Sequence, residues 1–127
     1  MVTIIKDIDR INEHLQQCKG GEAMIWLFST TFRRLCIRVW KDIKDPVETY
    51  IMLGGVRHMN GPFDIQGIDL RVGQMPDEHF GTCYYVVDEQ NGFQLQAYAH
   101  VFLFHGDRSL FSNDLNSFVD WDKVVEA

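Results

Sequence analysis

Two segments of the chain are apolar on both sides of an extended backbone, and this feature constrains the fold most. In residues 97–104, alanine, valine and leucine side chains alternate with tyrosine, histidine and phenylalanine. Residues 23–28 have the same two-sided apolar character. A strand with one face in water alternates apolar with polar residues instead. Both segments are therefore predicted to be central strands that other parts of the structure cover on both faces.

An N-terminal helix can supply part of that cover. Four apolar side chains recur at intervals of four, three and four residues, which is one stripe of an α-helix. They are Ile4, Ile8, Ile11 and Leu15. The pattern predicts a helix over residues 4–18, capped by Thr3 and ended by Gly20 and Gly21.

The middle of the chain predicts about six strands, at residues 23–31, 35–40, 48–59, 68–72, 82–88 and 93–105. Residues 73–81 are predicted to form a surface loop, and Asn91-Gly92 to form a two-residue hairpin turn. Gly54 and Gly55 indicate either a bulge or a close approach of the backbone. Short connections between strands favour antiparallel pairing.

A short second helix is predicted at the end of the chain. Ser117 and Asp120 have the spacing of a capping box, and the buried stripe would be Phe118, Trp121 and Val125. The predicted fold class is therefore α+β, with an N-terminal helix, one antiparallel curved sheet of about six strands and a short C-terminal helix. The sheet would form a partial barrel, and a two-sheet sandwich is the alternative.

The composition is that of one globular domain, residues 1–127. Of the 127 residues, 46% are hydrophobic and 24% are charged, and the formal net charge is −6. The chain has no apolar run long enough for a membrane helix, and charged residues stand where a secretory signal would be apolar. We therefore expect a cytoplasmic location without membrane contact. The acidic balance also argues against nucleic acid as a partner.

Neither a cofactor nor a metal ion is expected. The chain contains no phosphate loop, no dinucleotide fingerprint and no nucleophile elbow. Its three cysteines are widely spaced, which fits neither a zinc site nor a disulfide framework. Asp77, Glu78 and His79 are adjacent in the predicted loop, but this spacing matches no known ligand set.

One pair of residues could carry chemistry. With a two-residue turn at Asn91-Gly92, His100 would lie opposite Cys83, and Tyr98 opposite Tyr85. An imidazole beside a thiol can draw off its proton and produce a nucleophilic thiolate. Cys83 and His100 are therefore the candidate catalytic residues. The alternative interpretation is a buried cysteine beside a hydrogen-bonded histidine.

A cluster of basic residues gives a candidate anion-binding site. Five of the 12 basic side chains fall between positions 33 and 44. On an extended strand, Arg34 and Arg38 point to the same side, and Trp40 follows them. Arginines with an aromatic neighbour can hold phosphates. The alternative is an exposed sheet face whose arginines pair with carboxylates elsewhere.

Three classes of function remain open, and we favour them in the following order. The first is an interaction protein, expected to be a homodimer or to bind a protein partner through Tyr98, Phe102 and Phe104. The second is a small-molecule binder with an aromatic pocket under the curved sheet, lined by Trp26, Phe28, Tyr85, Tyr98 and Phe102. The third is an enzyme that uses Cys83 and His100.

Overall fold

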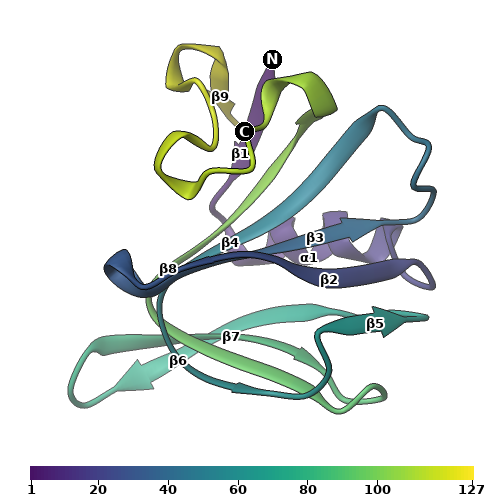
Figure 1. Cartoon of the computed structure of the whole chain (residues 1–127). Helices are drawn as coiled ribbons and strands as arrows, with labels where there is room; N and C mark the ends of the chain where they lie inside the picture. The colour runs from purple at the N-terminus through teal and green to yellow at the C-terminus, as the bar shows by residue number, and fades with distance from the viewer.

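The computed structural model describes all 127 residues and consists of one nine-stranded sheet with a single α-helix (Figure 1). The helix α1 spans Ile8–Gln17. The strands are β1 (Val2–Ile5), β2 (Glu22–Ser29), β3 (Arg34–Trp40), β4 (Val47–Asn60), β5 (Asp64–Gln66), β6 (Arg71–Asp77), β7 (Gly81–Asp88), β8 (Phe93–Asp107) and β9 (Val124–Glu126). Their order is β5-β2-β3-β4-β8-β1-β9, and β7 and β6 extend the sheet from β8.

The two longest strands, β4 and β8, pair along most of their length and form the spine of the sheet. The first part of β8 pairs on its other side with β7, whereas the later part pairs with β1. β4 changes register with β8 at Gly54 and again beyond Val56. Such bulges bend a strand. The sheet therefore divides into a lower half with β6 and β7 and an upper half with β1 and β9 (Figure 1).

The predicted fold class is wrong in several respects. The sheet is open and has nine strands instead of about six, and it is mixed because β1 and β9 pair in parallel. The chain has no C-terminal helix. Its last residues form short 3₁₀ turns at Leu115–Ser117 and Trp121–Lys123, followed by β9. The aspartates before these turns, Asp114 and Asp120, accept hydrogen bonds from backbone N–H groups two residues ahead, which favours a tight turn over an α-helix.

The N-terminal helix is present but begins four residues later than predicted. Val2 and Ile4 are buried in one core and Ile5 in the other, which is the alternation of a strand. The cap is therefore Asp7 instead of Thr3, and its carboxylate accepts from the backbone N–H of Arg10 at 3.0 Å.

Helix α1 is attached to the sheet by polar as well as apolar contacts. The Asn12 side chain donates to the backbone oxygen of Val72 and accepts from its N–H, both at 2.8 Å. Val72 lies on β6, whose outer edge has no partner strand. His14 lies 3.3 Å from the Thr49 hydroxyl, and this oxygen lies 3.0 Å from Nδ1 of His105.

Two cores lie on opposite faces of the sheet. The first contains 20 buried residues on the side of α1. The second contains eight, and it lies between the other face and residues 108–123, which we call the C-terminal segment. Residues 97–104 contribute to both cores, with Leu103 in the first and Phe104 in the second. Here the prediction of a central strand covered on both faces is only partly correct, because Tyr98, His100 and Phe102 are half-buried and Ala99 is exposed. In residues 23–28 the prediction is only partly correct, because Phe28 is 57% exposed.

The segment predicted as a loop, residues 73–81, contains most of β6 and the start of β7. Its two glycines and its proline are typical of a loop, but Pro76 lies on an edge strand. There the missing N–H removes no bond of a central ladder.

Candidate functional site

A pocket opens where the C-terminal segment lies on the sheet, and we call it the Arg34 pocket. Its walls are Arg34, Met52, His100, Phe102, Phe104 and side chains of residues 115–121. Seven of its ten lining residues are hydrophobic, and its volume is about 230 Å³. Pockets for drug-sized ligands measure ~300–1,000 Å³. This pocket therefore has room for a small molecule of about one ring.

Arg34 is the cationic group of this pocket. Its Nη1 donates to the backbone oxygen of Leu115 at 2.9 Å, and its Nη2 donates to Oδ1 of Asn116 at 2.6 Å. These bonds fix the guanidinium against the C-terminal segment. No carboxylate lies within 4.0 Å of it. An arginine has five N–H donors, so Arg34 keeps both a free charge and free donors for a ligand.

His100 supplies the second polar group. Its ring stacks on Phe102 with a centroid distance of 4.5 Å and an interplanar angle of 12°. Burial lowers the pKa of His100, and the positive charge of Arg34 lowers it further. The imidazole is therefore neutral at pH 7 and can donate or accept one hydrogen bond from each ring nitrogen.

Gly54 makes the position of His100 possible. A Cβ atom at residue 54 would lie 2.3 Å from Cε1 of the His100 ring. The next glycine, Gly55, has a φ of +71°, which side chains with a Cβ rarely adopt. The two glycines therefore serve both purposes that the sequence indicated, a bulge and a close approach.

The predicted pairing of Cys83 with His100 is wrong. β7 and β8 are joined by four residues, 89–92, instead of two, so Tyr84 pairs with Ala97. This register is displaced by two residues, so Cys83 comes next to the Tyr84–Ala97 pair instead of lying opposite His100. The Cys83 thiol is buried, and it donates to the backbone oxygen of Tyr84 at 3.8 Å. No imidazole is therefore in place to activate it.

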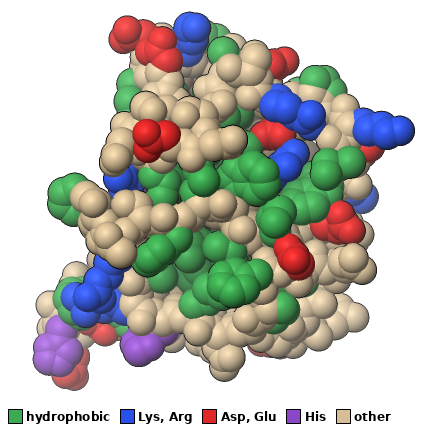
Figure 2. All heavy atoms as spheres, viewed as in Figure 1, with side chains coloured by type: hydrophobic (Ala, Val, Ile, Leu, Met, Phe, Trp, Pro, Cys, Tyr) green, Lys and Arg blue, Asp and Glu red, His purple; other side chains and the backbone are tan.

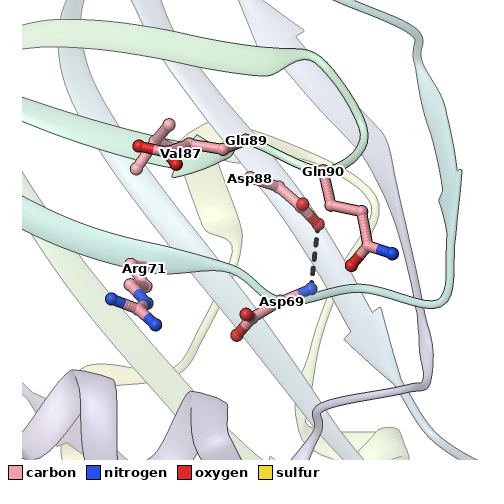
Figure 3. Close-up of a pocket in the computed structure, with 6 residues that line it drawn as sticks. All are labelled: Asp69, Arg71, Val87, Asp88, Glu89 and Gln90. Atoms are coloured by element: carbon pink, nitrogen blue, oxygen red, sulfur yellow. Dashed lines mark hydrogen bonds between the residues drawn. The ribbon is translucent and has the colours of Figure 1, made fainter.

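Asp88 explains the longer turn (Figure 3). Its carboxylate is buried and accepts from the backbone N–H groups of Asp69 at 2.9 Å and Asn91 at 3.2 Å. The side-chain amide of Asn91 adds a third bond at 2.9 Å. The polar pocket around these residues measures about 230 Å³. Because the Asp88 oxygens are occupied by the chain itself, we assign this pocket a structural role.

The five aromatic residues predicted to line one pocket under the sheet do not come together. The first core fills that side of the sheet. Phe102 lines the Arg34 pocket, whereas Trp26 lines a separate pocket with Arg38. Tyr98 packs on Phe80 with a centroid distance of 4.8 Å. The other two, Tyr85 and Phe28, lie on β7 and β2, and Tyr85 pairs with Gln96.

The predicted interface residues also differ in their surroundings. Phe104 is only 2% exposed, because Phe118 and Trp121 of the same chain pack on it at centroid distances of 5.7 and 6.0 Å. Tyr98 and Phe102 are half-buried. Sequence reasoning placed Phe118 and Trp121 on a predicted helix and missed that the C-terminal segment forms a wall of this pocket, with Leu115 and Asn116 bonded to Arg34. Two aromatic residues that flank its polar stretch, Phe111 and Phe118, would have been the signal for it, since both pack on the sheet through Tyr50.

The remaining findings concern the whole chain. None of the helices has the length and apolar character needed to cross a membrane. No group of three or more histidine, cysteine, aspartate or glutamate side chains is arranged to hold a metal ion. Comparisons with protein families, with curated proteins and with solved structures found nothing that matches this chain.

Proposed function

We propose that this protein binds a small ligand in the Arg34 pocket. The observation that carries the proposal is an arginine without an ionic partner in the wall of a mostly hydrophobic pocket. A mostly apolar pocket with a few convergent polar groups is the usual form of a small-molecule site. His100, a half-buried histidine whose pKa is lowered by burial and by Arg34, strengthens the proposal.

The lining residues define the chemistry of the ligand. A planar guanidinium binds a carboxylate through two parallel hydrogen bonds. Beside it, the apolar lining of the pocket, which includes Phe102, Phe104 and Phe118, offers surface against which an aromatic ring can pack. With about 230 Å³ of space, the best fit is a single-ring carboxylate.

Benzoate tests this proposal, with benzamide as the neutral compound of the same shape. In a titration followed by ¹⁵N–¹H NMR, benzoate should shift signals of the pocket and saturate, and benzamide should bind more weakly. Arg34→Gln should weaken benzoate binding by about tenfold, the value of one charge-assisted pair. Arg33→Gln is the matched control, because Arg33 is an exposed neighbour outside the pocket.

Two results would contradict the proposal. Equal binding of benzoate and benzamide would show that Arg34 does not select a carboxylate. Equal losses in Arg34→Gln and Arg33→Gln would show only a general charge effect. A lower pH adds a further check. Benzoate affinity should rise as the pH falls toward the lowered pKa of His100, because protonated His100 adds a second positive charge.

An interaction function is the second candidate. Phe28, Phe32 and Phe63 are 57%, 80% and 66% exposed. Figure 2 shows hydrophobic side chains gathered across the middle of the face that carries β2. Clustered exposed apolar side chains are typical of interaction sites. If a second copy covers them, light scattering should give twice the mass of 14.8 kDa, and Phe63→Ser should restore the monomer mass. A monomer mass in the unmodified chain would contradict self-association.

A further inference from the structure

A second pocket lies beside the C-terminal segment, near the other end of β3, and we call it the Arg38 pocket. Its walls include Trp26 of β2, Arg38 of β3, Glu48 of β4 and Arg108 after β8. Its volume is about 300 Å³. None of its residues belongs to the Arg34 pocket.

Glu48 organises this pocket but does not neutralise it. The Glu48 carboxylate is only 7% exposed, and its Oε1 accepts from Nη2 of Arg38 at 2.7 Å and from Nε of Arg108 at 2.8 Å. Its Oε2 accepts from the hydroxyl of Tyr50. Neither guanidinium has another carboxylate within 4.0 Å. Two cations and one anion leave one net positive charge at the pocket.

Arg38 is held rigidly and has donors to spare. Its guanidinium carbon lies 4.9 Å from the ring centroid of Trp26 and 5.2 Å from that of Trp40. Its side chain is only 12% exposed. Of its N–H groups, only those of Nη2 have a partner within the chain, the Glu48 carboxylate. A fixed, desolvated guanidinium with free donors is the usual anchor of an oxyanion.

Unpaired buried donors point to the same chemistry. Only three buried side-chain nitrogen or oxygen atoms in the chain have no hydrogen-bond partner. Two of them are N–H donors of residues that line this pocket, Nε1 of Trp26 and Nε of Arg38. Buried donors normally have an acceptor. An acceptor with negative charge would satisfy these donors and balance the net charge.

We propose that the Arg38 pocket is a second binding site, and that it takes an oxyanion such as the phosphate or carboxylate group of a small ligand. The indole rings of Trp26 and Trp40 that lie against Arg38 fix its position before the ligand arrives, which lowers the entropy cost of binding. Arg108 is half exposed, so it lies where an entering anion meets it first.

The indole N–H signals of the three tryptophans report directly on this site. Inorganic phosphate and acetate are titrated at constant ionic strength, with chloride as the third anion, and Trp26→Phe identifies the Trp26 signal. The Trp26 signal should shift and saturate with phosphate or acetate but not with chloride. The signal of Trp121, which lines the Arg34 pocket, reports separately on carboxylate binding there. A stronger response to phosphate assigns a phosphorylated ligand, and a stronger response to acetate assigns a carboxylate.

Two variants complete the test. Arg108→Gln should weaken the anion response by about tenfold, whereas Arg10→Gln, an exposed arginine on α1, should leave it unchanged. Arg34→Gln should also leave it unchanged, which separates this site from the Arg34 pocket. The proposal is overturned if the Trp26 signal does not move, if chloride acts like phosphate, or if Arg108→Gln and Arg10→Gln respond alike.

Discussion

Asn12 closes the free edge of the sheet, and its removal should have a measurable cost. In Asn12→Ala, Val72 loses both hydrogen bonds to the Asn12 side chain. Each bond contributes about 0.5–1.5 kcal/mol. Alanine returns about 0.5 kcal/mol, because it is the better helix former. The expected loss of unfolding free energy is therefore about 0.5–2.5 kcal/mol.

Urea denaturation measures this loss. With a urea dependence of about 2 kcal/mol/M for a small protein, the midpoint should fall by about 0.3–1.2 M. Gln16→Ala is the control, because Gln16 is exposed on the same helix. The variant should also self-associate at high concentration, since the uncovered edge of β6 can pair with another strand. Equal midpoints for Asn12→Ala and Gln16→Ala would refute the reasoning.

Further predictions concern residues that support the Arg34 pocket, the contact between α1 and the sheet, and the second core. Gly54→Ala should weaken benzoate binding in the NMR titration while the protein stays folded, because its Cβ displaces the His100 ring. Stability measured by urea denaturation should fall as the pH drops below 6.5, since burial lowers the folded-state pKa values of His14 and His105, with a further contribution from their mutual repulsion at His14. Below pH 6.5 the unfolded chain binds more protons than the folded one, and the loss of unfolding free energy stops below the folded-state pKa values. His14→Gln should make the unfolding free energy depend less steeply on pH. Phe104→Asp should unfold the protein, seen by circular dichroism, because it buries a charge under the C-terminal segment at a cost of several kcal/mol; a folded variant would contradict that placement.

Local periodicity predicted those parts of the fold in which one face decides the structure. Ile11 and Leu15 are buried at helical spacing, and α1 lies within the predicted range, although it begins four residues later. Ile4 also matches that spacing, but it belongs to β1. The spacing of apolar residues alone therefore does not show where the strand ends and the helix begins. The deciding signal was Asp7, whose carboxylate caps the helix.

Register depends on contacts that the local sequence does not contain. Asn91-Gly92 correctly predicted a hairpin, but the turn includes two more residues because Asp88 is bonded to the backbone of Asp69, in the connection between β5 and β6. This distant bond shifts the pairing by two residues. The shift preserves which side chains face the core and changes which of them face each other. That change alone removed the predicted pair of Cys83 and His100.

The arginine pair shows the same division between local and distant information. Arg34 and Arg38 lie on one face of β3, as their spacing of four residues predicted, because β3 pairs regularly with β4. At about 3.3 Å per residue they are ~13 Å apart, too far to share a small anion. The C-terminal segment then separates their surroundings, with Leu115 and Asn116 bonded to Arg34 and Arg108 sharing a carboxylate with Arg38. One basic strand therefore serves two pockets, and each can be disabled by a substitution that leaves the other intact.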